Sequence, residues 1–441
     1  MIWLYIFLNA VVLINGFLYV HRMGTRRVMP FAICLILLSI YCLFTPTYFY
    51  LIDRQTSMGD DGLFLFTGKN ITGYYEKGMF FYMIANTLFI AGFIWKRYPI
   101  HLFRYTIKSE AISRLQNWSL FLYCLFFSIV FIDIAISGIN PLDILLGSAN
   151  ESLFGQESIT NSYYFRNCAD CIITTIVLFA YLKGNKYKVT AMILMAFILF
   201  AIMGFRYRII LTILGLILVY GLDTKSIIPF SRILLTSIIL IYFIFFITYN
   251  RWNFIQGRFS DLSYNPVEFE YGVFFEQTRA SLADFNLIRY YEANPEIHHD
   301  YGLTMFGYVL IKALPKFVFP NGVKPYPPPA LTILDNSLEL PKQWARTGEA
   351  TLHYGAFYGA FGGLGFVIMP FLMGFWLRFV VSRNPAFTPL GFLKQVVFSL
   401  AIFQFVTRGY FPQFVDHFVY ISLPVWLLSG LLKRSTVLST P

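Results

Sequence analysis

Long apolar stretches alternate with short polar ones along the whole chain. A helix needs about 20 apolar residues to cross roughly 30 Å of hydrocarbon. Strands of a membrane barrel would instead alternate in polarity over about ten residues, which these windows do not do. The pattern therefore predicts an all-α polytopic bundle of about eleven transmembrane helices. They are expected at 2–20, 29–51, 78–95, 117–137, 167–182, 189–203, 209–221, 231–249, 352–379, 389–407 and 414–432.

Lysine and arginine concentrate in alternate loops between these windows. The positive-inside rule makes those loops cytoplasmic, which places the N-terminus outside and the C-terminus in the cytoplasm. The first window lacks a basic leader and a cleavage site, so we interpret it as a retained helix. The basic set is Arg22, Arg26 and Arg27; Lys96, Arg97, Arg104, Lys108 and Arg114; Lys183, Lys186 and Lys188; Lys225 and Arg232; Arg378 and Arg383; Lys433 and Arg434.

One external loop, 250–351, separates helices 1–8 (1–249) from helices 9–11 and a cytoplasmic tail (352–441). It holds 9 of the 20 prolines, and a structureless loop of this length would be unusual, so we expect it to fold. The apolar spacing predicts a helix between Glu268 and Glu292 and a short interfacial or re-entrant helix at 303–314. A stiff, extended stretch is expected at 315–329.

Composition supports the membrane assignment, because 57% of residues are hydrophobic and only 13% are charged. The net charge of +11 is explained by cytoplasmic loops that meet anionic lipid head groups, without a nucleic-acid partner. All five cysteines lie in or beside spans. The pair Cys168 and Cys171 is interpreted as buried and structural, although a metal or redox role fits the same spacing.

Four arginines are expected on the outer side, where positive charge is usually scarce: Arg206, Arg208, Arg279 and Arg408. The guanidinium fork matches phosphate oxygens bidentately, so the four are candidate ligands of a lipid-linked phosphate or pyrophosphate. The competing interpretation is separate salt bridges with loop carboxylates, or side chains that reach the lipid head groups.

Glu349 and His353 lie four residues apart at the outer start of the ninth span. On a helix they would share one face, where either side chain is a candidate general base for a hydroxyl. A helix-terminal carboxylate and an interfacial histidine are the simpler interpretation. Gly355, Gly359 and Gly363 follow at four-residue spacing and predict a face for close helix packing.

The sequence offers little for other chemistries. The adjacent His298, His299 and Asp300 are weak grounds for a metal site, and we expect neither a metal nor a cofactor. There is no glycine-rich phosphate loop and no Asp-x-Asp pair, and the cytoplasmic loops are too short to fold a nucleotide site.

The chain resembles the Wzy family of bacterial O-antigen and exopolysaccharide repeat-unit polymerases. The topology is similar throughout, and the likeness is sharper at Gly204-Phe-Arg206-Tyr-Arg208, at 315–329, at 348–363 and at Thr407-Arg408-Gly409. The resemblance implies a C-type glycosyltransferase of the bacterial inner membrane that uses neither a nucleotide-sugar nor a metal. Its donor and acceptor would be undecaprenyl-pyrophosphate-linked glycans, and a chain-length regulator and a lipid-linked glycan flippase would be candidate partners.

Two other functions fit the same topology. An O-antigen ligase would use the same donor but pass the glycan to lipid A core. A lipid-linked glycan flippase or another transporter would typically show internal repeats and charged residues near the bilayer midplane, neither of which is evident in the sequence.

Overall fold

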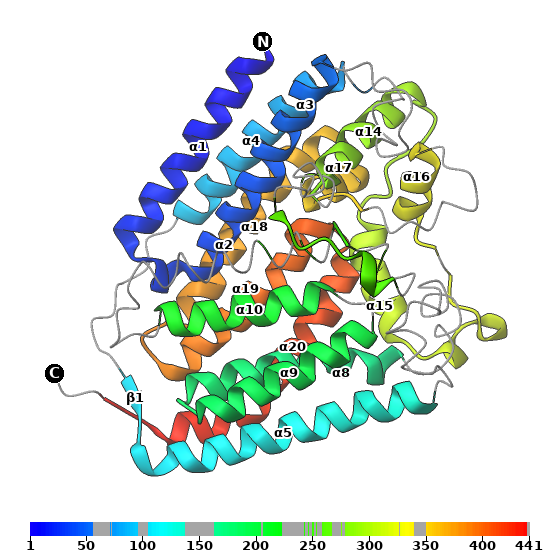
Figure 1. The fold of residues 1–441 in the computed structure, drawn as a ribbon. Helices are drawn as coiled ribbons and strands as arrows, with labels where there is room; N and C mark the ends of the chain where they lie inside the picture. Colours follow the sequence, from blue (N-terminus) through cyan, green and yellow to red (C-terminus); the bar gives the residue numbers. More distant parts are fainter. Residues whose placement is uncertain are drawn as a thin grey trace. The chain divides into compact units, whose positions relative to one another are not determined.

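A computed structural model describes residues 1–55, 71, 73–95, 105–136, 163–203, 206–222, 242, 246, 249–250, 253, 258–266, 275, 278–325, 327–338 and 350–438. The described chain is mostly helical (Figure 1). Seven of its helices are long and apolar enough to cross a membrane, as expected of an all-α polytopic membrane protein. They are Ile2–Met23, Thr25–Leu51, Tyr74–Ile94, Ser109–Ile136, His353–Arg383, Pro389–Arg408 and Phe411–Arg434.

These seven helices match seven of the eleven predicted windows. Three further windows, at 167–182, 189–203 and 209–221, coincide with α8 (Tyr163–Tyr181), α9 (Lys186–Ile202) and α10 (Arg206–Leu222). Most of the window at 231–249 lies outside the described residues. The count of eleven spans therefore stays a prediction.

The chain divides into two compact units, and each draws on all three segments of the sequence-based division. Unit 1 comprises Met1–His101, Phe275–Arg383 and Ala401–Asp416, and unit 2 comprises Leu102–Phe274, Asn384–Leu400 and His417–Pro441. Two helices, α19 (Pro389–Arg408) and α20 (Phe411–Arg434), contribute residues to both units.

The first half of unit 1 is built on α1 (Ile2–Met23), α2 (Met29–Ser39), α3 (Thr45–Gln55) and α4 (Tyr74–Ile94). A π-helical turn, η2 (Ile40–Phe44), joins α2 to α3 without interrupting the span. Such turns are frequent at functional sites, because the extra residue redirects the side chains that follow it.

Unit 1 is completed by α17 (His353–Phe361) and α18 (Gly365–Arg383), and α4 packs along α18. Glycines allow this close approach, because a Cβ at Gly92 would lie 2.2 Å from the Phe371 carbonyl oxygen and one at Gly374 would lie 2.0 Å from that of Phe89. The structure thus puts the tight helix contact at glycines that the sequence analysis did not select.

The predicted glycine face at 355–363 is only partly realised. A Cβ at Gly355 would lie 2.1 Å from Asp284 Oδ1, but one at Gly363 would meet nothing within 4 Å. The reason is that α17 ends at Phe361 and Gly362 turns the chain with φ 63°, so the three glycines do not share one helix.

The described part of the segment 250–351 folds, as the sequence predicts. The helix expected between Glu268 and Glu292 is present as α14 (Ala280–Ala293), and residues 281–288 are all buried rather than along one face alone. It packs against α4, α17 and α16 (Pro329–Leu338). The helix α14 is therefore part of the core of unit 1.

The apolar stretch 303–314 forms a π turn, η7 (Leu303–Gly307), and then α15 (Tyr308–Ala313), which together are too short to cross a bilayer. The proline-rich stretch is less extended than expected. It contains two short 3₁₀ turns, η8 (Lys316–Val318) and η9 (Pro320–Gly322).

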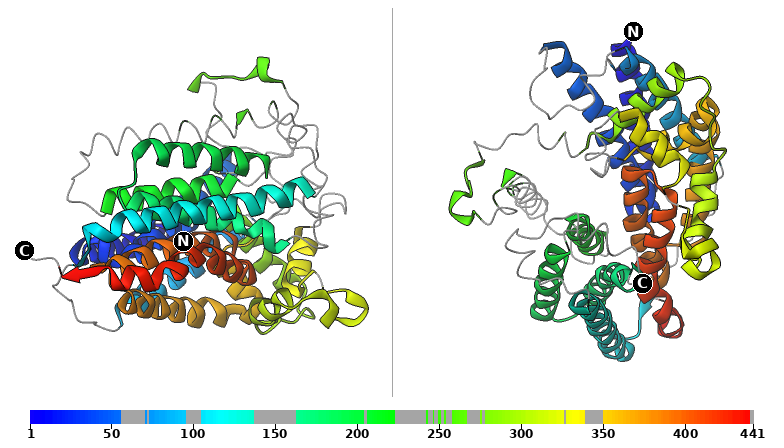
Figure 2. Two further views of the ribbon diagram at one scale, coloured as in Figure 1. Left: turned by 90° about the horizontal axis from the view of Figure 1, so that it is seen from below. Right: turned by 90° about the vertical axis from the view of Figure 1, so that its right-hand side faces the viewer.

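Unit 2 contains α5 (Ser109–Ile136), which packs along α8, and α8 in turn contacts α9 and α10 (Figures 1 and 2). Polar side chains link these apolar helices through backbone carbonyls. Ser119 Oγ donates to the Thr175 carbonyl at 3.0 Å, and Tyr123 Oη donates to the Met192 carbonyl at 2.8 Å. Such interhelical bonds each contribute about 0.6–2 kcal/mol in membrane proteins.

Unit 2 also contains a small antiparallel pair of strands. The strand β1 (Tyr105–Ile107) pairs with β2 (Thr436–Leu438), with Thr106 opposite Val437. Both strands fall in segments that the charge pattern predicts to be cytoplasmic. Hydropathy gives no signal for this pairing, because each strand is only three residues long.

Candidate functional site

The most unusual feature of unit 2 is a group of buried charges on helices that are otherwise apolar. Asp170 lies on α8, one helical turn after Arg166, and both are buried. Charged side chains on apolar helices are costly and are usually paired, so the partners of these two residues define the site.

Arg208, in the first turn of α10, is the principal partner of Asp170. Its Nε donates to Asp170 Oδ1 at 2.6 Å, and the arginine and aspartate side chains are 2% and 4% exposed. A charge-assisted hydrogen bond this short and this buried holds the guanidinium in a fixed orientation.

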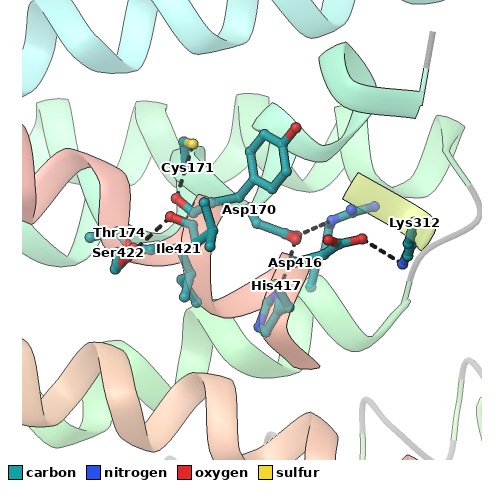
Figure 3. A network of polar contacts seen from close by, with 11 residues as sticks. Asp170, Cys171, Thr174, Lys312, Asp416, His417, Ile421 and Ser422 are labelled. Carbon is teal, nitrogen blue, oxygen red and sulfur yellow. Dashed lines mark hydrogen bonds and ion pairs between the residues drawn. The ribbon is translucent and has the colours of Figure 1, made fainter. Parts of the chain in front are cut away.

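The other oxygen of Asp170 bonds to His417, in the second turn of α20. The distance from His417 Nδ1 to Asp170 Oδ2 is 2.8 Å, and the His417 side chain is 2% exposed (Figure 3). Because an ionised carboxylate only accepts hydrogen bonds, the imidazole donates through Nδ1. Two bonds anchor α20 to α8 nearby: Cys171 Sγ donates to the Tyr420 carbonyl at 3.1 Å, and Thr174 Oγ1 donates to the Ile421 carbonyl at 2.5 Å.

A second pair lies close to the first. Arg166 Nε is 3.5 Å from Asp133 Oδ2, and these side chains are 6% and 4% exposed. We call the five residues Asp133, Arg166, Asp170, Arg208 and His417 the buried ionic cluster. Its two arginines balance its two aspartates in formal charge when His417 is neutral.

The buried ionic cluster lies at one end of the helices of unit 2. Asp133 is in the last turn of α5, whereas Arg166 and Arg208 are in the first turns of α8 and α10. Loop charge predicts that all these ends face the outside. Tyr207 lies beside both Arg208 and His417. Its ring centroid is 5.1 Å from Arg208 Cζ and 6.2 Å from the centroid of the His417 ring.

The predicted arginines divide between the two units. Arg206 begins α10 in unit 2, and its side chain lies outside the described residues. Arg279 and Arg408 belong to unit 1. Arg208 pairs with Asp170, a carboxylate inside a predicted span rather than in the external loop, and its assignment to pyrophosphate stays a prediction.

Arg279 and Arg408 lie near the same turn of unit 1. Arg408 is the last residue of α19, is exposed, and interacts electrostatically with Tyr41. Arg279 caps the start of α14 beside Thr278, whose hydroxyl is 2.7 Å from that of Thr45. Tyr41 lies in η2 and Thr45 directly follows it, so both arginines are linked to residues at this π turn.

His353 begins α17 but is not at a surface. It is fully buried, its Nδ1 is 3.2 Å from the Val406 carbonyl oxygen, and its ring lies 4.0 Å from Tyr354 and 5.8 Å from Phe405 between centroids. Glu349, the other candidate base, lies outside the described residues. The predicted pairing of the two therefore stays a prediction.

Asp284 of α14 is a buried carboxylate that the sequence analysis did not select. Its Oδ2 accepts from Tyr82 Oη at 2.8 Å and its Oδ1 from the Leu352 N–H at 2.9 Å. It also accepts from the Gly355 N–H, and so it caps the first turn of α17. Burial raises the pKa of the Asp284 carboxyl well above its ordinary value, although these three hydrogen bonds lower it in part.

Neutral side chains continue the polar interior of unit 1. Asn86 Nδ2 donates to Asn9 Oδ1 at 2.8 Å, and Tyr354 Oη donates to Asn86 Oδ1 at 2.9 Å. Asn9 in turn donates to the Cys42 carbonyl at 3.0 Å. Unit 1 is thus joined by hydrogen bonds that run from α1 through α4 to α17.

The remaining candidates have local structural partners. His299 Nδ1 is 3.2 Å from the Gly359 carbonyl oxygen, and the ring stacks on Tyr291. Asp300 accepts from the N–H groups of Gly302 and Thr304, which secures the start of η7. All five cysteines are free thiols, and Cys171 is buried.

One signal could have identified the cluster from the sequence. Asp133, Asp170 and His417 fall inside predicted spans, and an ionisable residue within a span is a functional candidate by default. The sequence analysis selected arginines at span ends together with Glu349 and His353, and it did not select these three residues. What it could not supply is the pairing, since α8, α10 and α20 are far apart in the chain.

No protein-family model matches the chain, and no curated protein or solved structure is significantly similar to it.

Proposed function

We propose that this protein polymerises polysaccharide repeat units on the outer face of the bacterial inner membrane. A nonreducing-end hydroxyl of one undecaprenyl-pyrophosphate-linked unit attacks the anomeric carbon of a lipid-linked chain, and the lipid pyrophosphate leaves. The observation that carries the proposal is Arg208, held by Asp170 at the helix ends where loop charge predicts the outer face. Fixed donors stabilise the charge that develops on a leaving group better than mobile ones do.

Sequence and structure contribute different support. The Wzy-like motif Gly204-Phe-Arg206-Tyr-Arg208 leads into α10, and its last residue joins the buried ionic cluster. The segment 278–338 of unit 1 is folded, and its helices α14 and α16 pack against α17, as expected of a long external segment that has a function. In this proposal the partners are membrane lipids, the two lipid-linked glycans, a chain-length regulator and a flippase.

An O-antigen ligase is an alternative within the same chemistry, since it differs only in its acceptor. A transporter of lipid-linked glycans is a second candidate, and one observation favours it. Buried ionised residues on apolar helices are typical of transport pathways, and the cluster on α5, α8, α10 and α20 is of this kind.

Deletion of the gene followed by gel analysis of the cell-surface glycan separates these functions. A polymerase mutant retains a single repeat unit on its acceptor and loses the ladder. A ligase mutant leaves the acceptor without any repeat unit, and a flippase mutant accumulates lipid-linked units on the cytoplasmic side. Retention of the full ladder would overturn all three.

A further inference from the structure

The two ring nitrogens of His417 differ in their hydrogen bonding. Its Nδ1 bonds to Asp170, whereas its Nε2 is buried and has no hydrogen-bond partner among the described residues. A buried polar atom left unsatisfied costs about 1–3 kcal/mol. Such an atom calls for an explanation, and a substrate group that bonds to it during the reaction is one.

We propose that His417 is the base that removes the proton from the attacking hydroxyl, with Asp170 and Arg208 as its positioning residues. This inference rests on the proposed polymerase function. It moves the base from the sequence-based candidates Glu349 and His353 to a histidine on α20.

The geometry suits this role in two respects. The carboxylate of Asp170 fixes the tautomer that carries hydrogen on Nδ1, which leaves the lone pair on Nε2, and it stabilises the imidazolium that forms. Arg208 binds the other carboxylate oxygen at 2.6 Å and so prevents Asp170 from turning away. The aspartate is thereby held in place from both sides.

Charge balance supports the same assignment. With His417 neutral, the charges of Arg166 and Arg208 offset those of Asp133 and Asp170. The net formal charge of the five residues of the buried ionic cluster is then zero. Accepting one proton gives the cluster a charge of +1, which is made at the moment when negative charge develops on the leaving pyrophosphate. Opposite charges that appear together in a buried site stabilise the transition state.

The step balances as follows. The acceptor O–H bond breaks and its proton passes to His417 Nε2. The oxygen forms a bond to the anomeric carbon of the donor, while the bond from that carbon to the pyrophosphate oxygen breaks and its electron pair stays on the pyrophosphate. The proton on His417 then leaves to the pyrophosphate or to water, which restores the neutral ring.

His353 provides the matched comparison. Its Nδ1 also has a partner and its Nε2 is also buried without one among the described residues. The partner, however, is the neutral Val406 carbonyl, and the ring is packed among Tyr354, Phe357 and Phe405. A neutral carbonyl stabilises an imidazolium less than a carboxylate does, so His353 is the poorer base.

The test replaces each histidine by asparagine, whose amide N–H takes the place of Nδ1–H while the basic nitrogen is lost. Purified variants in proteoliposomes receive lipid-linked repeat units. We expect His417→Asn to lower kcat by about 10²–10⁴-fold with little change in KM, and His353→Asn to stay near the wild-type rate.

The outcomes separate the two proposals. Wild type that makes no polymer overturns the proposed function, and the base assignment with it. Active wild type with an active His417→Asn overturns the base assignment alone. A slow variant in which the loss lies in KM rather than in kcat does so as well, because it would mark a structural role. His417→Gln, with thermal unfolding as the check on folding, replaces the asparagine variant if that one does not fold.

Discussion

The two units solve the problem of polar groups among apolar helices in opposite ways. Unit 1 uses neutral hydrogen bonds among Asn9, Asn86 and Tyr354, and a carboxylate, Asp284, whose pKa is raised by burial. Its buried arginine, Arg378, lies over the ring of Phe93. Unit 2 uses ionised pairs, in which Asp170 is bonded to both Arg208 and His417. Neutral bonds join helices at little desolvation cost, whereas buried charges are expensive and are retained where they do something else. The contrast is the reason why we assign the proposed chemistry to unit 2 and a structural role to the polar core of unit 1.

Removing one member of each network should lower the stability of the protein more when the residue lies in unit 2. Asp170→Ala leaves Arg208 buried without its counter-charge, which costs about 3–5 kcal/mol. Asn86→Leu deletes neutral bonds, and we expect about 1–2 kcal/mol there. Thermal unfolding of the purified variants in detergent measures both. Equal losses would mean that the cluster is no more critical to the fold than the neutral network.

A double variant separates stability from chemistry in unit 2. Asp170→Leu with Arg208→Met replaces the ion pair by apolar side chains of similar volume, which commonly restores stability. We expect the double variant to fold and to make no polymer. A folded double variant with wild-type polymer would show that the pair serves only the structure.

The next largest effect is expected from a change that keeps the charge. Arg208→Lys retains a cation but loses the planar fork, and loss of one fixed donor to developing charge costs about 2.7–4 kcal/mol, or a hundredfold or more in rate. Arg206→Lys is expected to act in the same direction. Arg289→Lys, on α14 of unit 1, is the control and should keep the wild-type ladder. Normal ladders from both Arg206→Lys and Arg208→Lys would remove the pyrophosphate role from these residues.

Variants of Asp284 test the structural role that we assign to the polar core of unit 1. Because burial raises its pKa, folding favours its protonated form, and this contribution to stability is lost as the pH rises through the raised pKa. Asp284→Asn should remove that pH dependence and unfold near the wild-type temperature in acid. Asp284→Ala leaves three donors without an acceptor and should cost about 1–3 kcal/mol at any pH. An asparagine variant with an unchanged pH profile of unfolding would contradict this account.

A further prediction concerns the contact of Asp284 with α17. A methyl group at Gly355 would lie 2.1 Å from Asp284 Oδ1, so Gly355→Ala should lower stability by about 1–3 kcal/mol. Gly363→Ala is the matched control, since nothing lies within 4 Å of the added atom. Circular dichroism on heating measures the unfolding temperatures of both variants. Equal temperatures would mean that the Asp284 side chain moves away from the added methyl group at no cost in stability.

Hydropathy predicted much of the fold, because apolar length is a local property. Ten of the eleven windows overlap helices in the described chain, and α14 and α15 were foreseen within the segment 250–351. The π turn at Ile40–Phe44 and the short ladder of β1 with β2 were not, because they depend on packing. The same distinction applies to the site. Arg208 was selected by its position in the sequence, but Asp170 and His417 were identified through contacts across 38 and 247 residues of chain.

The central claim is that this protein joins lipid-linked repeat units. The most direct measurement uses purified protein in liposomes with undecaprenyl-pyrophosphate-linked repeat units as its sole substrate, and follows glycan length and released undecaprenyl pyrophosphate by mass spectrometry. The account predicts a ladder of lengthened glycans and one lipid pyrophosphate released for each unit added, both lost in Arg208→Lys. Lipid-linked units that cross the bilayer without growing in length would contradict it and identify a transporter.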